Sequence, residues 1–189
     1  MDSRIKIEKT SEFEEWYNSL RTKEKMQVDK RLAKIAFHSH FGDVKGLGDG
    51  LAELRWKNGW RIYFCRPSQS TVLVLLGVIK MDKKKTSKKR GFCFDEMPIV
   101  ALKPTVKTTE HHPEEIFRDV KKVGAALLEC LLENDVKAFL EILDGFLLIN
   151  RMKVAKKAKL ARSTVQQALS GKGNPTLKTL AKIVHESMS

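Results

Sequence analysis

A short run of hydrogen-bonding side chains near the end of the chain has the composition of a DNA-reading helix: Arg162, Ser163, Thr164, Gln166 and Gln167. A recognition helix places such side chains against base edges in the major groove. Arginine pairs with guanine and glutamine with adenine, each through two hydrogen bonds. The run therefore predicts sequence-specific contacts with duplex DNA, while Lys172 and nearby lysines would hold phosphates without reading sequence.

The residues around this run predict the helix-turn-helix that would position it, at about residues 152–170. Residues 152–158 form the expected first helix, 159–161 the turn and 162–170 the recognition helix, which ends at Gly171 as a glycine C-cap. A further helix should follow. The expected inward side chains are Val154, Ala155, Leu160, Val165, Leu169, Leu177, Leu180, Ile183 and Val184. The alternative is a helical bundle whose basic face is only solvated.

Charge is distributed unevenly along the chain, which has 36 basic and 23 acidic residues. Residues 1–96 carry 21 basic and 13 acidic side chains, residues 97–150 carry 6 and 9, and residues 151–189 carry 9 and 1. Two basic blocks thus flank an acidic one. Basic blocks favour polyanionic partners such as nucleic acid, although charge that serves only solubility would give the same count.

The cysteines and the hydrophobic pattern exclude several classes of protein. Cys65, Cys93 and Cys130 lack CxxC spacing, so we expect neither a zinc site nor a disulfide framework. No metal or other cofactor is expected. No run of about 18 apolar residues and no charged-then-apolar leader occurs. We therefore expect a soluble cytoplasmic protein with no membrane contact.

Composition divides the chain into two domains joined by a linker. A lysine-rich run at 83–90 and prolines at 98, 104 and 113, which break regular structure, place the linker at residues 86–112. Residues 1–85 then form the N-terminal domain, and residues 113–189 form the C-terminal domain that contains the helix-turn-helix.

Apolar spacing predicts two helices ahead of the helix-turn-helix. The first runs over 116–134 and begins near Pro113, a residue suited to the first helical turn. The second runs over 136–149, and the helix-turn-helix begins around Asn150. The acidic block lies within residues 110–145: Glu110, Glu114, Glu115, Asp119, Glu129, Glu133, Asp135, Glu141 and Asp144.

Two helices are predicted near the N-terminus. Ser11 and Glu14 have the spacing of a capping box at the start of the first. The second is expected over 23–37, with an apolar side of Val28, Leu32, Ile35 and Ala36. Its other side carries the basic residues Lys25, Lys30, Arg31 and Lys34.

The strands predicted for this domain make it an α+β unit, with a small antiparallel sheet and two helices on one face. A short first strand is expected at 4–8, and residues 71–78, apolar on both faces, suit a central strand. Residues 42–50 are rich in glycine and are expected to form a turn. They lack the GK[ST] of a phosphate-binding loop.

Residues 51–65 predict a β-hairpin, because Asn-Gly is a strong turn signal. A three-residue loop with Gly59 in the left-handed region pairs two sets of residues directly: Arg55 with Arg61, and Glu53 with Tyr63. The opposite face is then wholly apolar. A two-residue loop would mix the two faces, so burial favours the three-residue loop.

Across residues 10–85, the order of GDVKGLGDGLAELRW, GWRIYFC and VLVLLGVIK resembles the killer toxins of type II toxin–antitoxin modules, the RelE/HigB superfamily in its phage-derived branch. The resemblance implies a ribosome-dependent messenger-RNA endonuclease that needs no metal. It implies that Arg61 stabilises phosphoryl charge and that Arg55, Lys45 and Lys80 line the RNA groove.

Such a site would work by charge and proton transfer. Guanidinium groups hold phosphate oxygens, and a lysine acts as a general base only when neighbouring cations lower its pKa. The ring of Lys45, Arg55, Arg61 and Lys80 would supply those cations. The tyrosine or histidine that serves some relatives as general acid has no clear counterpart. Two alternatives therefore stand: a DNA-binding regulator with an inactive toxin domain, and a ParE-like toxin directed at gyrase.

From about residue 113 to 184, and most clearly in LARSTVQQALSGKGNPTLKTLAKI, the chain resembles HigA-like antitoxins of the Xre class. Ala161 departs from the serine expected as the recognition-helix cap, a loss of about 1 kcal/mol. The resemblance implies neutralisation of a toxin and autorepression as a homodimer on a two-fold operator.

Together the two resemblances predict a fused toxin–antitoxin protein. Its partners would be operator DNA and messenger RNA on the ribosome. The toxin–antitoxin contact would form within one chain or between chains, with the acidic block near the basic groove of the toxin domain.

Overall fold

The computed structural model describes residues 4–79, 99, 106–158, 169 and 175–188, and within them the chain is an α+β protein of two compact units. One unit comprises Met1–Leu20 and Arg31–His112, and the other Arg21–Lys30 and Pro113–Ser189. The strands are β1 (Lys6–Lys9), β2 (Val44–Gly48), β3 (Leu51–Arg55), β4 (Trp60–Ser68), β5 (Thr71–Ile79) and β6 (Thr109–Glu110). The helices are α1 (Ser11–Ser19), α2 (Thr22–His38), the 3₁₀ helix η1 (Glu115–Phe117), α3 (Val120–Leu132), α4 (Val136–Ala158) and α6 (Leu177–Met188). None of the described helices has the length and apolar character needed to cross a membrane.

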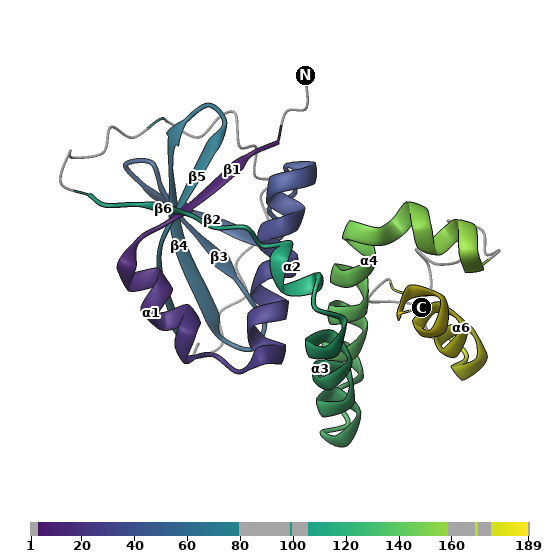
Figure 1. Ribbon diagram of the computed structural model, residues 1–189. Helices are drawn as coiled ribbons and strands as arrows, with labels where there is room; N and C mark the ends of the chain where they lie inside the picture. Colours follow the sequence, from purple (N-terminus) through teal and green to yellow (C-terminus); the bar gives the residue numbers. More distant parts are fainter. Residues whose placement is uncertain (1–3, 80–98, 100–105, 159–168, 170–174, 189) are drawn as a thin grey trace. The chain divides into compact units, whose positions relative to one another are not determined.

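The sheet is mixed and has the order β2-β3-β4-β5-β1-β6 (Figure 1). β1 lies parallel to β5, and the other neighbours are antiparallel. The sequence prediction of a turn over residues 42–50 was wrong, because Val44–Gly48 pairs with β3 as an edge strand. A register shift between Gly46 and Gly48 accommodates the glycines, as is common for bulges at sheet edges. Strand β6 lies within the segment expected to be linker.

The predicted hairpin of β3 and β4 is confirmed in its register. Arg55 pairs with Arg61, and Glu53 pairs with Tyr63. Gly59 has a φ of 93°, the left-handed conformation that the three-residue loop requires of a glycine. The apolar face is buried through Leu54, Trp60, Ile62 and Phe64.

Helix α1 begins at a different cap from the predicted Ser11. The Thr10 hydroxyl accepts a hydrogen bond from the Phe13 amide at 3.3 Å and donates one to the Leu75 carbonyl at 2.6 Å. Farther along α1, the Trp16 ring packs on Gly77 of β5, where an added Cβ would lie 2.0 Å from a ring carbon. The helix therefore approaches β5 more closely than a side chain at position 77 would permit.

Helix α2 spans the predicted 23–37 with one residue more at each end. Its predicted apolar side is confirmed, since Val28, Leu32, Ile35 and Ala36 are buried. Arg31, on the predicted basic side, is partly buried. Its guanidinium donates to the carbonyl oxygens of Phe41, Asp43 and Arg55, at 2.5–2.9 Å, because the chain after α2 turns back around it.

The helices after residue 113 also depart from the sequence prediction. Glu115–Phe117 is a 3₁₀ turn, and α3 begins only after Asp119, whose carboxylate accepts from the Lys122 amide at 3.1 Å. Helix α4 continues without interruption through Asn150, where a new helix was expected, and its ribbon changes direction along its length (Figure 1). On α6, Ile183 is buried as predicted, but Leu177 is 82% exposed.

Candidate nucleic-acid-binding surfaces

The strand registers bring three of the four predicted RNA-groove residues to one face of the sheet. Lys45 lies opposite Glu53 and then Tyr63, and Arg55 lies opposite Arg61 in the adjacent row. Side chains at alternate positions of a strand share a face. This face is opposite the one that carries Gly77 and therefore α1. The fourth residue, Lys80, lies outside the described residues.

Arg61 is held by its own hairpin. The residue is 5% exposed, and its Nη1 donates to the carbonyl oxygens of Trp56 at 3.1 Å and Trp60 at 2.9 Å. Both acceptors flank the turn that joins β3 to β4. The guanidinium thus stabilises the hairpin, a role that its sequence position alone did not reveal.

Arg55 is bound by a carboxylate. Its Nη2 lies 2.7 Å and its Nε 3.2 Å from Asp43 Oδ1. Lys45 is exposed, and Glu53 opposite it is buried. The predicted ring of cations therefore contains two acidic residues, which lower the positive field available to a phosphate.

Sequence reasoning missed Arg31 as the organiser of this region. Besides its carbonyl contacts, its guanidinium lies 4.5 Å from the centroid of the Trp56 ring. Gly42, with a φ of 71°, leaves room for it, since an added Cβ would lie 3.1 Å from Arg31 Nη2. The glycine that precedes Asp43 was the one available signal, because a close approach of two groups often requires glycine.

A second cluster of charges lies in the other unit, between the first half of α2 and the helices α3 and α4. The Lys23 ammonium, on a residue only 4% exposed, is hydrogen-bonded to Glu133 and lies 3.7 Å from Asp135. Farther along α2, Gln27 donates to Glu141 at 2.9 Å, and Lys30 lies 3.1 Å from Asp144. Arg21, just before α2, extends the cluster, since its Nη1 lies 3.1 Å from Glu129 Oε1 and 2.9 Å from Glu133 Oε1.

The pKa shifts in this cluster follow from its pairing. Burial acts to lower the pKa of Lys23, but the hydrogen bond and the charge of Glu133 outweigh it, so that the pKa is raised. Hydrogen bonds from Lys23 and Arg21 lower the pKa of Glu133. Burial raises the pKa of the nearby Cys130 thiol to about 11. Both members of the Lys23–Glu133 pair are thus stabilised in their charged forms at neutral pH.

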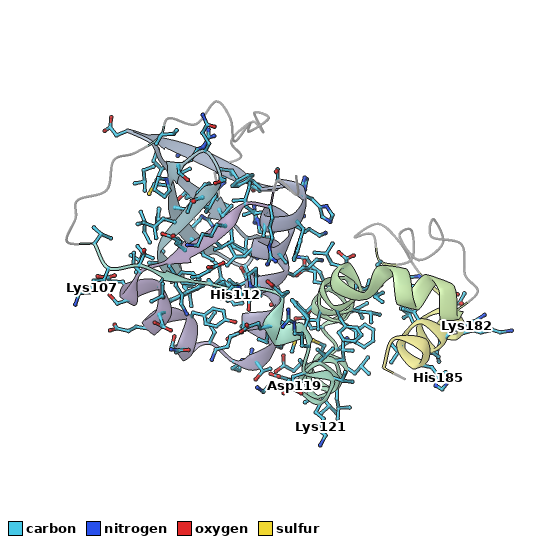
Figure 2. The ribbon with its side chains drawn as sticks, turned by 45° about the horizontal axis from the view of Figure 1, so that its top comes forward. Lys107, His112, Asp119, Lys121, Lys182 and His185 are labelled. Carbon is cyan, nitrogen blue, oxygen red and sulfur yellow. The ribbon has the colours of Figure 1, made fainter. Side chains whose placement is uncertain are left out.

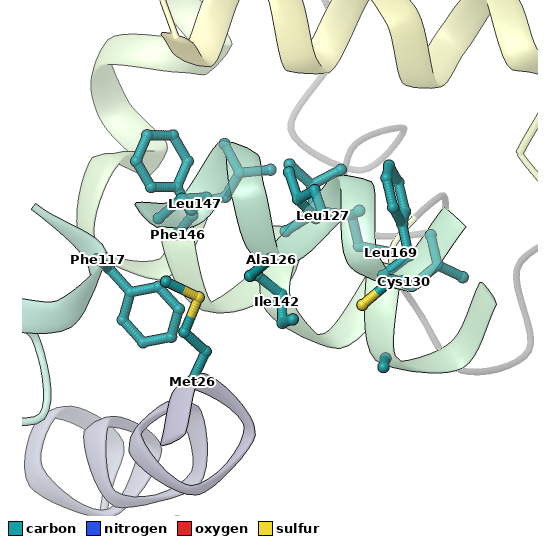
Figure 3. Close-up of a cluster of buried hydrophobic side chains, with 14 of the residues drawn as sticks. Met26, Phe117, Ala126, Leu127, Cys130, Ile142, Phe146, Leu147 and Leu169 are labelled. Atoms are coloured by element: carbon teal, nitrogen blue, oxygen red, sulfur yellow. The ribbon is translucent and has the colours of Figure 1, made fainter. Parts of the chain in front are cut away.

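Apolar packing accompanies these ion pairs. Met26 of α2 is fully buried and belongs to the same core cluster as Phe117 of η1 and Ile142 of α4. Figure 3 shows its side chain extending from α2 to the ring of Phe117. At Gly145, an added Cβ would lie 2.6 Å from the Phe117 ring and 3.2 Å from Lys30 Cβ. Helix α4 therefore needs a glycine there to approach α2 and η1.

The predicted DNA-reading residues lie outside the described residues: Arg162, Ser163, Thr164, Gln166, Gln167 and Lys172. The described parts on either side are the backbone of α4 to Ala158 and helix α6. Leu169, between them, is buried in the same core as Ile183, as expected from the sequence. On α6, Lys178 and Lys182 are exposed, and Lys182 is labelled in Figure 2.

No family model matches this chain, and no solved structure matches it. The chain is similar to an uncharacterized protein of Haemophilus influenzae, with 29% identity over 96 residues. The match covers 49% of this chain and 96% of that protein. Nearly all of a free-standing protein thus corresponds to about half of this chain. Within the described part of the chain, no group of three or more histidine, cysteine or acidic side chains is arranged to hold a metal ion.

Proposed function

We propose that the chain is a toxin–antitoxin module in one polypeptide. Its N-terminal part is a RelE/HigB-like toxin that cleaves messenger RNA on the ribosome, and its C-terminal part is a HigA-like antitoxin that restrains it and binds operator DNA. The observation that carries the proposal is the packing of the C-terminal helices on residues 21–30 of α2. An apolar anchor and a row of ion pairs hold a helix that begins in the N-terminal part of the sequence.

The acidic block supports this proposal in a modified form. It was expected to lie near the RNA groove, but Glu133, Asp135 and Asp144 contact Lys23 and Lys30 of α2. Exposed ion pairs contribute little to affinity. Burial of Met26 therefore supplies most of the free energy that holds α2 against the C-terminal helices. The half-length relative in Haemophilus influenzae supports an origin from separate proteins, because one half of the chain has a free-standing counterpart.

The RNA-cleaving part of the proposal rests on the shared sheet face of Lys45, Arg55 and Arg61. In this role Lys45 supplies an exposed positive charge. The Arg55 guanidinium binds the scissile phosphate after exchanging Asp43 for phosphate oxygens. A phosphate oxygen can replace the carboxylate oxygen because both are anionic hydrogen-bond acceptors for a guanidinium.

The test is inducible expression of residues 1–112 beside the full chain. The fragment ends at 112 because β6 pairs with β1 through residues 109–110. We expect growth arrest with loss of translation from the fragment and normal growth from the full chain. Growth arrest with DNA damage instead would identify a gyrase-directed toxin. Because removal of the C-terminal helices exposes Met26, the full chain with Met26→Asp is a second route to release that needs no truncation.

The control variant is Lys45→Ala, because Lys45 is exposed and its loss leaves the fold intact. Arg61→Ala is a poorer choice, since Arg61 also holds the hairpin turn. Relief of arrest by Lys45→Ala, with the fragment still soluble and folded by circular dichroism, supports RNA contact at this face. Undiminished arrest in that variant contradicts it.

The hydrogen bonds and ion pair that already occupy Arg55 and Arg61 favour a second candidate function. Arg61 is nearly buried and bound to backbone carbonyls, and Arg55 is paired with Asp43. Under this reading the chain is a DNA-binding regulator whose sheet domain cleaves nothing. A folded, soluble fragment 1–112 that leaves growth and ribosome-bound RNA unchanged would establish it over the first.

Both candidates share the DNA-binding activity, which is tested on the full chain with DNA from upstream of its own coding sequence. Arg162→Ala and Gln166→Ala are expected to weaken specific binding by about 1–3 kcal/mol each. Lys172→Ala is expected to weaken binding to all sequences and to reduce the salt dependence by about one ion. Equal loss on specific and random DNA from all three variants would contradict base reading by this helix.

A further inference from the structure

Helix α3 is apolar around most of its circumference, although only one side of it is covered within the described residues. Val123, Ala126, Leu127 and Cys130 are buried. Next to them around the helix is a second apolar set, here called the α3 stripe: Val120, Leu128, Leu131 and Leu132, which are 41%, 57%, 60% and 80% exposed. A helix that is apolar on all sides is normally covered on all sides. The stripe therefore has the character of a contact surface.

The centre of the stripe is open. At 100° per residue, Gly124 lies between Val120 and Leu128 on the exposed side. Apart from its own helix backbone, a Cβ added to Gly124 would meet no atom of the described residues within 4 Å. Glycine lowers helix stability by about 0.5–1 kcal/mol relative to alanine, and no close contact among the described residues requires it here. The open space at Gly124 and the exposed side chain of Leu128, one helical turn away, are complementary in shape.

Apart from the N-cap Asp119, the charges of α3 run opposite to the preference of its own helix dipole. Its first turn carries Lys121 and Lys122 and no acid, and its last turn carries no base. Cations are favourable at a helix C-terminus and unfavourable at an N-terminus. Lys122 is 3.4 Å from Asp119, whereas Lys121 projects from the outer side of the helix (Figure 2). An antiparallel copy of α3 would place each Lys121 at the C-terminal end of the other helix.

One register satisfies all three observations. When Gly124 of one copy lies opposite Leu128 of the other, two-fold symmetry repeats the contact. The same register sets Val120 opposite Leu132, and Lys121 opposite Leu131 in the last turn. A parallel arrangement would bring the two Lys121 ammonium groups together, which is unfavourable. The stripe is thus complementary to itself in shape, polarity and charge, as an isologous interface requires.

We propose that the α3 stripe is the surface by which two copies of this chain associate, with their α3 helices antiparallel about a two-fold axis. The occupant is a second copy and not a different protein, because Gly124 and Leu128, and Lys121 and the helix C-terminus, complete each other only in that arrangement. One helix of about 20 Å per copy is a small interface. The dimer is therefore concentration-dependent, and it does not rest on the proposed toxin–antitoxin function.

The first test is the mass of the full chain in solution over a hundredfold range of concentration, by sedimentation or light scattering. We expect a monomer–dimer equilibrium for the wild type. Leu128→Glu and Gly124→Leu should each shift it to monomer, the second without loss of helix content because leucine favours helix. Leu177→Glu, on the exposed Leu177 of α6, is the matched control and should dimerise as the wild type does. A monomer at every concentration, or a Leu128→Glu dimer, overturns the proposal.

The second test is the register. In a Cys93→Ser background, Gly124→Cys combined with Leu128→Cys should form a disulfide-linked dimer under mild oxidation. Cys65 and Cys130 are buried and leave the background low. Either cysteine alone should cross-link poorly, because each faces the other position in the second copy. Equal cross-linking by Leu128→Cys alone would overturn the antiparallel register.

Discussion

The sheet face of β2–β4 and the first half of α2 are two places where this chain gathers cations, and the two use them differently. On the sheet, Arg61 is satisfied by backbone carbonyls and Arg55 by Asp43, a residue close in the sequence. On α2, Lys23 and Lys30 are satisfied by carboxylates more than a hundred residues away. Positive charge that suggests a nucleic-acid surface from the sequence therefore serves the fold in both places, while Lys45 on the sheet face is exposed.

The difference lies in what surrounds the charges. The α2 pairs frame a buried apolar side chain, Met26, while the pairs on the sheet stabilise a turn and an edge. Ion pairs beside an apolar core set which helix faces meet, and the core supplies the stabilisation. The comparison predicts that apolar and shape changes at α2 have larger effects than charge changes at either place.

The largest effect is expected from Met26→Ala, which leaves a cavity among Phe117 and the α4 side chains. It should lower the unfolding free energy of the unit formed by residues 21–30 and 113–189 by about 2–5 kcal/mol. Chemical denaturation followed by circular dichroism measures it. Leu177→Ala, at an exposed position, should change stability by less than about 0.5 kcal/mol. Similar values for the two would remove Met26 as an anchor.

Two glycines in the same unit should respond with opposite signs. Gly145→Ala forces the α4 backbone away from Phe117 and should destabilise by roughly 1–3 kcal/mol. Gly124→Ala adds its methyl group in open space on α3 and should stabilise the unfolding transition by about 0.5–1 kcal/mol. Thermal melts of the two variants at one low concentration, where self-association is least, compare them. The same sign for both would mean that close approach at Gly145 is unimportant.

Exchanging one lysine in each place compares the two clusters directly. Lys23→Met leaves Glu133 and Asp135 without their buried partner. Because both carboxylates are 41% exposed, the loss should be roughly 1–2 kcal/mol, below the ~3–5 kcal/mol of a fully buried pair. Lys45→Met should not change stability. A stability loss in Lys45→Met as large as that in Lys23→Met would end the distinction between the clusters.

The smallest expected effect is on the dependence of stability on acidic pH. The pKa of Glu133 is lowered by Lys23 and Arg21, so its contribution is present above the ordinary pKa of a glutamate. It is lost as pH falls through the lower value of the folded protein. Glu133→Gln should therefore flatten the acid side of the stability profile and leave the profile near neutral pH parallel to that of the wild type. Denaturation midpoints at several pH values test this, and an unchanged acid side would contradict it.

The elements that local pattern determines were largely predictable. The hairpin register followed from Asn58-Gly59 and the burial of alternate residues, and the apolar side of α2 followed from its spacing. The strand β2 was missed because its glycines resemble a turn, and pairing with β3 is not visible in the segment itself. The start of α3 at Asp119 was missed because Pro113 offered an equally good local signal.

The candidate sites were less predictable because their contacts are distant in the sequence. Nothing in the spacing of Arg31 indicates that a loop will fold around it, and nothing near Lys23 identifies Glu133 as its partner. The sequence groups lysines and arginines by their charge. Whether each of them is buried depends on which helices and loops pack against it. For the DNA-reading residues, the sequence prediction stays a prediction, since they lie outside the described residues.

The continuity of α2 has a consequence in time. The residues that contact Lys23 and Gln27 are 110 and 114 positions farther along the chain. At about 5–20 residues per second, a ribosome needs roughly 5–20 seconds to make that stretch. During each round of synthesis, the first half of α2 therefore exists before the helices that hold it. In the proposed module, the order of translation therefore sets a delay between synthesis of the toxin half and synthesis of the antitoxin half.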